Sequence, residues 1–160
     1  MLIRSHLFAV LVLGVFQLSA VLTRPALADE TSAAYFVFEQ PSPDRKKVNR
    51  FVFKLLDQDR IGEARSILAG RNGGRQSVMG TIVKRRAPYN PQWSFHLEPS
   101  TISFFENAVE VCDANMTYIE EHLEEIGGSA LPRSHWCPWQ SILTEELTSQ
   151  IDPATETPAR

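Results

Sequence analysis

The two cysteines of this 160-residue chain, Cys112 and Cys137, constrain its fold more than any other feature. They follow an N-terminal segment with the pattern of a secretory signal peptide, and exported proteins fold in oxidising compartments. Two cysteines there favour one disulfide, which would close a 26-residue loop and stabilise the fold by roughly 3.5 kcal/mol on the chain-entropy estimate. The alternative is a metal site that includes His135, but a metal needs three or four convergent ligands. We therefore predict a disulfide, no metal site and no cofactor.

The first 28 residues carry the signal pattern. Arg4 and His6 precede a mostly apolar run from Leu7 to Leu22, and Ala26-Leu27-Ala28 then supplies small residues for cleavage. Polar residues interrupt this run, and no later stretch reaches the roughly 18 apolar residues of a membrane span. The sequence thus predicts a signal peptide over residues 1–28, no membrane span, and secretion to the periplasm or the extracellular space.

The rest of the chain divides into a central domain and two loose ends. Residues 29–48, with two prolines and a basic cluster, are interpreted as a flexible N-terminal segment. Residues 49–147 have the size and patterning of a single α+β domain. Residues 148–160 are predicted to be a disordered tail, because its end holds two prolines and no large apolar residue.

The charge of the chain is polarised. Residues 41–90 hold twelve Lys or Arg and four acidic residues, whereas residues 91–160 hold two Arg and twelve acidic residues. Such poles either pair inside the fold or leave one pole exposed for a partner. We favour internal pairing, and we predict no nucleic-acid partner.

Local patterns predict the first elements of the domain. Apolar and other residues alternate over Phe51–Leu55, as in a strand with one buried face. Asp57 or Asp59 can cap the helix that follows. Further strands are predicted over Ser77–Lys84 and Trp93–Leu97, and these two could form a hairpin with a long loop.

The strongest periodicity predicts a helix of about 23 residues. Its apolar positions are spaced alternately four and three residues apart, at Phe105, Val109, Cys112, Met116, Ile119, Leu123 and Ile126. Ser103 and Glu106 form a capping box at its start, and Trp136–Leu143 would supply a last strand. The order strand-helix-strand-strand-helix-strand predicts an α+β, ferredoxin-like split βαβ sandwich with one disulfide.

Catalytic motifs are absent from the sequence. It holds no serine-nucleophile elbow, no helical HExxH, no phosphate-binding loop and no dinucleotide fingerprint, so no catalytic residue is assigned. His96 and Glu98 lie two apart on one predicted strand and could form an acid–base pair or bind a polar ligand. The other interpretation is a solvated sheet face.

Aromatic residues near prolines and near Cys137 form a second candidate site. Exposed aromatic side chains bind sugars or peptides, whereas a Trp beside a disulfide usually packs in a core. Together with polar neighbours they make up the predicted binding set: Tyr89, Asn90, Trp93, His96, Glu98, His135, Trp136 and Trp139.

Six runs of residues resemble small secreted domains labelled calmodulin-binding-protein-like. These runs are Phe51-Val52-Phe53-Lys54-Leu55, Glu63-Ala64-Arg65-Ser66-Ile67-Leu68, Gly80-Thr81-Ile82-Val83-Lys84, Pro88-Tyr89-Asn90-Pro91-Gln92-Trp93-Ser94-Phe95-His96-Leu97, Val111-Cys112-Asp113-Ala114 and Trp136-Cys137-Pro138-Trp139. The resemblance covers residues 49–143 and implies a shared fold unit with a disulfide. It carries over no catalytic residue.

The functional expectation is a secreted, disulfide-stabilised binding module that recognises an extracellular protein, peptide or glycan. Calmodulin is not expected as its partner, because calmodulin targets are basic helices and residues 104–126 hold no Lys or Arg. One alternative is a small secreted hydrolase or metal-dependent enzyme that uses His96 and Glu98. Another is an inhibitor of an extracellular enzyme that docks through Pro88–Pro91.

Overall fold

The first sheet of the domain is built around an N-terminal strand. The computed structural model describes residues 33–71, 76–107 and 111–147. Within them, β1 (Ala34–Pro41) lies between β2 (Val48–Leu55) and β9 (Ile142–Leu147), antiparallel to both. The β1–β2 register pairs aromatic residues directly across the strands, Phe36 with Phe53 and Phe38 with Phe51. Such cross-strand aromatic pairs stabilise a sheet and specify its register.

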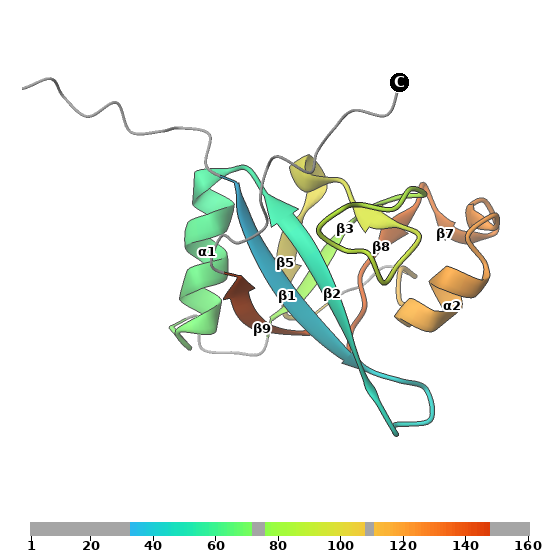
Figure 1. Ribbon diagram of the computed structural model, residues 1–160, viewed down its shortest axis with the longest axis horizontal. Helices are drawn as coiled ribbons and strands as arrows, with labels where there is room; N and C mark the ends of the chain where they lie inside the picture. Colours follow the sequence, from blue (N-terminus) through green and yellow to red (C-terminus); the bar gives the residue numbers. More distant parts are fainter. Residues whose placement is uncertain (1–32, 72–75, 108–110, 148–160) are drawn as a thin grey trace, which may run out of the picture. The chain divides into compact units, whose positions relative to one another are not determined.

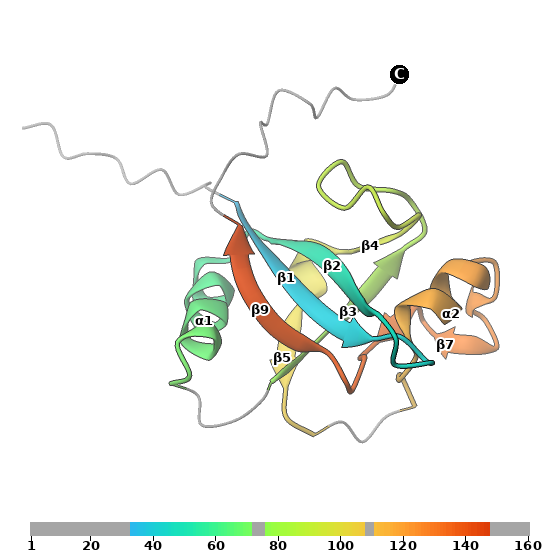
Figure 2. The same cartoon turned by 60° about the horizontal axis from the view of Figure 1, so that its bottom comes forward.

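The second sheet is centred on β3 (Ser77–Val83). This strand pairs antiparallel with β4, β5 and β8 at successive positions, and β6 pairs with β7. The remaining elements are α1 (Gln58–Leu68), β4 (His96–Leu97), the 3₁₀ helix η1 (Pro99–Thr101), β5 (Ser103–Phe105), α2 (Met116–Glu121), β6 (Ile126–Gly127), β7 (Ala130–Pro132) and β8 (His135–Trp136). Helices α1 and α2 lie at opposite ends of the two sheets (Figures 1 and 2). Neither helix has the length and apolar composition needed to cross a membrane.

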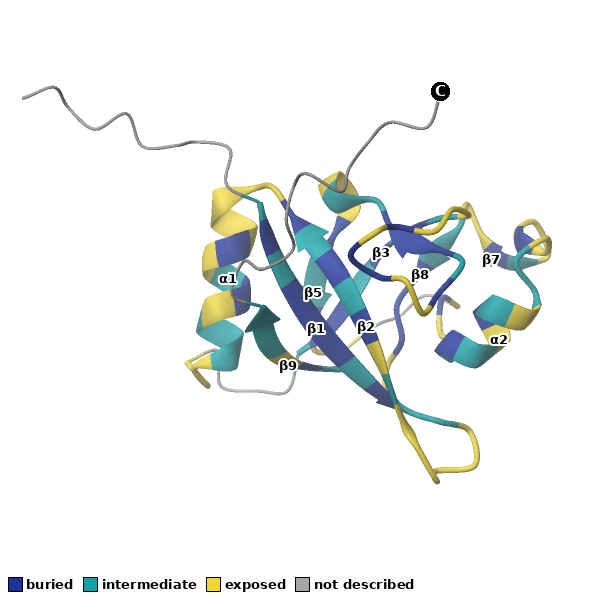
Figure 3. Cartoon of the chain, viewed as in Figure 1, coloured by how far each residue is buried: buried dark blue, intermediate teal, exposed yellow. Residues whose placement is uncertain are grey.

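Trp136 lies at the centre of an aromatic core between the sheets. Its ring centroid is 5.6 Å from that of Phe38, 5.5 Å from Phe51 and 5.7 Å from Phe95, and all four side chains are buried. Figure 3 shows the buried residues concentrated along β1 and on alternate positions of β2. The Trp136 indole N–H donates to the carbonyl of Ala114 at 2.8 Å. This hydrogen bond attaches the segment just before α2 to the core.

The predicted disulfide is confirmed. Cys112 and Cys137 are bonded with their Cα atoms 5.2 Å apart, and both side chains are buried beside Phe105. The backbone N–H of Cys137 also donates to the carbonyl of Cys112 at 2.9 Å. The bridge thus attaches residues 112–114 to the end of β8, directly beside Trp136.

The predicted long helix is wrong. Ser103–Phe105 forms β5, and a helix begins only at Met116. Asn115 ends the non-helical stretch, because its side chain accepts a hydrogen bond from the N–H of Tyr118 as an N-cap. Strand pairing of β5 with β3 and the disulfide at Cys112 outweigh the local helical pattern. Of the described residues in this pattern, Phe105 and Cys112 belong to the cluster at the disulfide, whereas the four from Met116 to Ile126 belong to or pack against the main core.

The α+β class is confirmed, but the ferredoxin-like arrangement is not. The strands before and after α1, β2 and β3, lie in different sheets, the β2-β1-β9 sheet and the sheet around β3, so they do not form a βαβ unit. The predicted strand over Trp136–Leu143 is divided as well. Residues of β8 and β9 flank a turn at Pro138, whose carbonyl accepts from the N–H of Ser141.

Other local predictions are confirmed. Strand β2 and helix α1 form as expected, and Asp57 caps α1 by accepting from the N–H of Arg60 at 2.9 Å. Strands β3 and β4 form the predicted hairpin, although β4 contains only His96 and Leu97.

The N-terminal boundary of the domain lies earlier than expected. Residues 34–41, assigned from the sequence to a flexible segment, form the central strand β1. The reason is that Phe36 and Phe38 supply half of the aromatic pairs with β2. The predicted signal peptide over residues 1–28 and the predicted tail over residues 148–160 lie outside the described residues.

Removal of the disulfide should destabilise the domain strongly. Replacement of both Cys112 and Cys137 by Ser is expected to lower the free energy of unfolding by roughly 3–4 kcal/mol, because the loop constraint on the unfolded chain is lost. Urea unfolding followed by tryptophan fluorescence measures this difference. Wild-type protein in reductant should match the double variant, and equal stability with and without the bridge would contradict the prediction.

Candidate functional site

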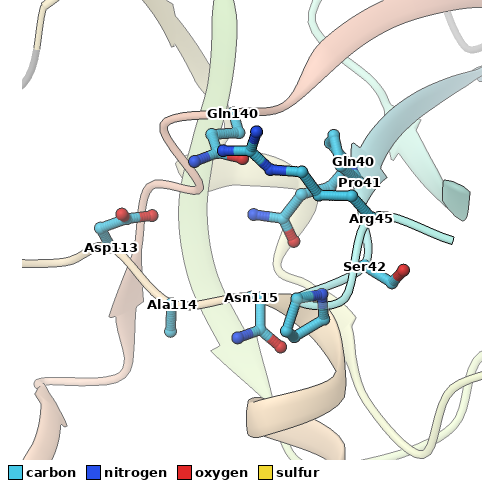
Figure 4. Close-up of a pocket in the computed structure, with 9 residues that line it drawn as sticks. Gln40, Pro41, Ser42, Arg45, Asp113, Ala114, Asn115 and Gln140 are labelled. Atoms are coloured by element: carbon cyan, nitrogen blue, oxygen red, sulfur yellow. The ribbon is translucent and has the colours of Figure 1, made fainter. Parts of the chain in front are cut away.

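A polar pocket lies between the β1–β2 hairpin and the residues before α2 (Figure 4). Its volume is about 340 Å³, which is within the range of small-ligand sites. Three carboxamides, one carboxylate, one guanidinium and one hydroxyl line it, from Gln40, Asn115, Gln140, Asp113, Arg45 and Ser42. Such a set can donate and accept hydrogen bonds in several directions.

The hairpin turn presents Arg45 to this pocket. The N–H of Arg45 donates to the carbonyl of Ser42 at 2.8 Å, and the Ser42 hydroxyl donates to Asp44 at 2.6 Å. The bond from the Ser42 hydroxyl, with a further bond from the N–H of Lys46, holds the pKa of Asp44 below its ordinary value. The guanidinium of Arg45 makes no ion pair or hydrogen bond with any described residue. Its side chain extends from the hairpin toward Gln140 (Figure 4).

Three further polar side chains of the pocket, Gln40 on β1 and Asp113 and Asn115 before α2, each make one hydrogen bond within the fold. Gln40 is buried, and its Oε1 accepts from the N–H of Met116 at 3.0 Å. Asn115 accepts from the N–H of Tyr118, and one carboxylate oxygen of Asp113 accepts from the N–H of Trp139 at 3.1 Å. The second polar atom of each of these three side chains is not bonded to any described residue. The fold therefore fixes the side chains and leaves donors and an acceptor for a ligand.

An apolar pocket adjoins the polar one. It has a volume of about 480 Å³ and shares residues 113–115 with the polar pocket as a common wall. Its apolar lining comes from Val111, Tyr118, Ala130, Leu131 and Pro132. Val111 is 93% exposed and Tyr118 is 37% exposed. Trp139, 51% exposed, lies beside the common wall through its bond to Asp113.

Strained backbone borders the same two pockets. Within the described ranges, the non-glycine residues with positive φ are Arg45 (56°), Leu131 (46°), Arg133 (60°) and Ser134 (58°). Arg45 lines the polar pocket, Leu131 lines the apolar pocket, and the other two follow Leu131 closely. This conformation costs an L-residue roughly 1–2 kcal/mol, and such strain clusters at functional sites.

A third pocket, of about 670 Å³, lies between α1 and η1. Its charged residues already have partners in the fold: Asp57 caps α1, and Arg60 is ion-paired with Glu63. It offers no unpaired polar cluster comparable to that around Arg45.

Two residues of the predicted binding set close the outer edge of β2. Asn90 accepts from the backbone N–H of Val52 at 3.1 Å, and the indole N–H of Trp93 donates to the carbonyl of Arg50 at 2.8 Å. Asn90 is 2% exposed and Trp93 is 9% exposed. These side chains bond backbone groups that an additional strand would otherwise pair with.

His96 and Glu98 have separate surroundings. His96 is buried, and its Nδ1 lies 2.6 Å from the carbonyl of Arg85, so that nitrogen must carry the proton. The ring of Tyr89 packs edge-on against His96 at 6.4 Å. Glu98 precedes η1 as its N-cap residue and accepts from the hydroxyl of Ser100. No hydrogen bond joins His96 to Glu98.

The rest of the predicted set lies at and beyond the end of β8. Trp136 is fully buried, His135 is half-buried, and Trp139 is exposed beside the common wall of the two pockets. Trp139 is thus the exposed residue of the predicted set that is bonded to this wall, whereas Trp136 is bonded to it from within the core through Ala114. Among the described residues, no group of three or more His, Cys, Asp or Glu side chains is arranged to hold a metal ion.

Sequence reasoning missed Gln40, Arg45, Asp113 and Asn115. These residues come from two regions about 70 positions apart, and none belongs to a recognised motif. The available signal was the Pro-Asp turn before Arg45, which is common in hairpins without any binding role.

Residues 32–150 match the family model described as the BP-74 N-terminal domain. This match confirms the resemblance to calmodulin-binding-protein-like domains that the sequence runs indicate. No match was found among curated proteins or among solved structures.

Loss of the edge contacts should destabilise the domain. Asn90→Ala leaves the N–H of Val52 without its partner and is expected to cost about 1–3 kcal/mol. Trp93→Phe keeps an aromatic ring but removes the donor, and should cost about 1 kcal/mol. Urea unfolding measures both, with the exposed Gln92→Ala of the same loop as the control. An Asn90→Ala variant as stable as the wild-type protein would contradict a structural role for this side chain.

Replacement of Arg45 by Gly should stabilise the protein. Gly adopts the left-handed conformation without strain, but it also has greater conformational freedom in the unfolded chain. The free energy of unfolding should therefore rise by about 0.5–1 kcal/mol. Lys46→Gly is the matched control, since Lys46 lacks a positive φ and the change there should be destabilising. A lower unfolding midpoint for Arg45→Gly than for wild type would show that the turn is not strained.

Proposed function

The chain belongs to the BP-74 N-terminal domain family, and we propose that this member is a secreted, disulfide-stabilised binding module for peptide segments of extracellular proteins. The proposed site consists of the polar and apolar pockets on either side of residues 113–115. The observation that carries the proposal is this shared wall, which places unpaired polar groups and exposed apolar side chains next to each other.

An extended peptide has the matching chemistry. Its backbone offers a donor and an acceptor at every residue, and its side chains alternate between two faces. Polar groups around Arg45 and Asn115 can bond the backbone or charged groups of such a segment. An apolar side chain of the same segment can enter the pocket lined by Val111, Tyr118 and Leu131.

The backbone of Asp113 supports the same interpretation. The carbonyls of its two neighbours, Cys112 and Ala114, are bonded to Cys137 and to Trp136. No hydrogen bond joins the N–H or carbonyl of Asp113 to another described residue. A bound peptide can therefore add main-chain hydrogen bonds at this point of the wall, as in other modes of peptide recognition.

Exposed apolar residues strengthen the case for a macromolecular partner. Val111 and Tyr118 line the apolar pocket, and Trp139 lies beside it. Aromatic residues contribute large contact areas in interfaces, and exposed apolar patches mark interaction sites more often than single scattered residues do.

A peptide screen tests the proposal. The full chain after residue 28 is offered a random peptide library and, in parallel, a glycan array. We expect peptides to be retained, and Arg45→Gly and Val111→Ser each to weaken a selected peptide about tenfold, the effect of losing one good contact. Lys46→Gly and Val48→Ser are the matched controls, because both side chains are exposed and outside the pockets.

The outcomes separate the possibilities. Retention of peptides that depend on Arg45 and Val111 but not on the controls supports the site. Retention of glycans alone, or equal loss of binding in the control variants, would refute it. Val111 is 93% exposed, so Val111→Ser should leave the fold intact.

A further inference from the structure

The polar pocket has the charge and hydrogen-bond donors to bind one particular group of a peptide. Building on the proposed function, we infer that it binds the free C-terminal carboxylate of the peptide, with Arg45 as the charged contact. Among the described residues that line this pocket, Arg45 carries the one cationic side chain. An Arg guanidinium bonds a carboxylate through two parallel N–H groups, which is stronger and more directional than a neutral hydrogen bond.

Arg45 has no ion-pair partner among the described residues, whereas some other cations of the basic pole are ion-paired within the fold. Arg50 is bonded to Glu145, and Arg65 is bonded to Glu146 with a closest distance of 2.6 Å. The favoured interpretation of the charge pattern, internal pairing, thus holds for these residues. What sets Arg45 apart is its position, since it lines the polar pocket and its side chain extends toward Gln140 (Figure 4).

The carboxamides complete the site for an anion. Gln40 and Asn115 use their oxygens to accept backbone N–H groups, so their NH₂ groups are left as donors. A carboxylate only accepts hydrogen bonds and needs several donors when it leaves water. These NH₂ groups and Arg45 supply them, Gln40 and Arg45 from the β1–β2 hairpin and Asn115 from the segment before α2 (Figure 4).

Asp113 sets the direction in which the peptide lies. Its carboxylate borders both pockets and repels another carboxylate, but it can accept a peptide N–H. The terminal carboxylate therefore lies on the side of Arg45, and the preceding residues cross residues 113–115 toward the apolar pocket. The apolar side chain bound there belongs to a residue near the C-terminus.

The lining of the pocket favours a chain end over an internal acidic residue. Three segments line it: the hairpin, residues 113–115 and Gln140. An internal residue would need space for the chain to enter and to leave, whereas a terminus needs one opening. With the terminus in this volume of about 340 Å³, the preceding residues can leave across residues 113–115, which also line the apolar pocket.

The test compares three peptide libraries of equal length on the wild-type chain. The first has free C-termini, the second is amidated, and the third is amidated and carries one internal Glu. We expect binding from the first library and at least tenfold weaker binding from the other two. Arg45→Gly should abolish the preference for free C-termini, whereas Lys46→Gly should retain it.

The possible results test different parts of the proposal. Equal binding of free and amidated peptides overturns the carboxylate inference and leaves the peptide-binding function in place. Equal binding of the Glu library and the free library also overturns it, because the anion would then be a side chain. Absence of binding from all three libraries refutes both the inference and the proposed function. A preference that persists in Arg45→Gly removes Arg45 from the site.

Discussion

The packing of Trp136 is the interaction on which the rest of the structure depends. Its ring joins Phe38 and Phe51 of the first sheet to Phe95 beside the second. Its N–H holds the carbonyl of Ala114, and the next residue, Cys137, is bonded to the segment at Cys112. The wall shared by the two pockets is therefore attached to the core twice, through a hydrogen bond and a covalent bridge. A site built on such a wall is rigid although it contains little regular secondary structure.

The composition of the loop before β4 indicates ligand binding, but the structure shows that the loop bonds the edge of β2. Aromatic and carboxamide side chains beside prolines are typical of ligand-binding loops, yet Asn90 and Trp93 bond the backbone of β2. An open strand edge is a site for unwanted pairing with other chains, and these side chains cover part of that edge. The same residue types can thus serve either a ligand or the protein's own backbone, and only their surroundings distinguish the two roles.

The candidate site combines side chains that are hydrogen-bonded to the fold with residues in strained backbone conformations. Gln40, Asp113 and Asn115 each hold part of the fold with one polar atom and face the polar pocket with the rest of the side chain. Arg45 and Leu131 contribute side chains from backbone conformations that cost energy. Membership of the family establishes the relationship of the chain. The ligand has to be argued from these side chains, because function resides in sites and not in folds.

The sequence by itself determined the features that depend on near neighbours or on covalent chemistry. Strand β2, helix α1 with its Asp57 cap, the β3–β4 hairpin and the Cys112–Cys137 bridge could be predicted because alternation, capping and cysteine count are readable over short windows. The tertiary structure decided the central place of β1, the absence of a long helix before Met116, and the pocket around Arg45. These depend on contacts between distant residues, such as Gln40 with Met116 and Asp113 with Trp139. Local periodicity carries no information about such pairs, since their energy is gained only when the sheets pack together.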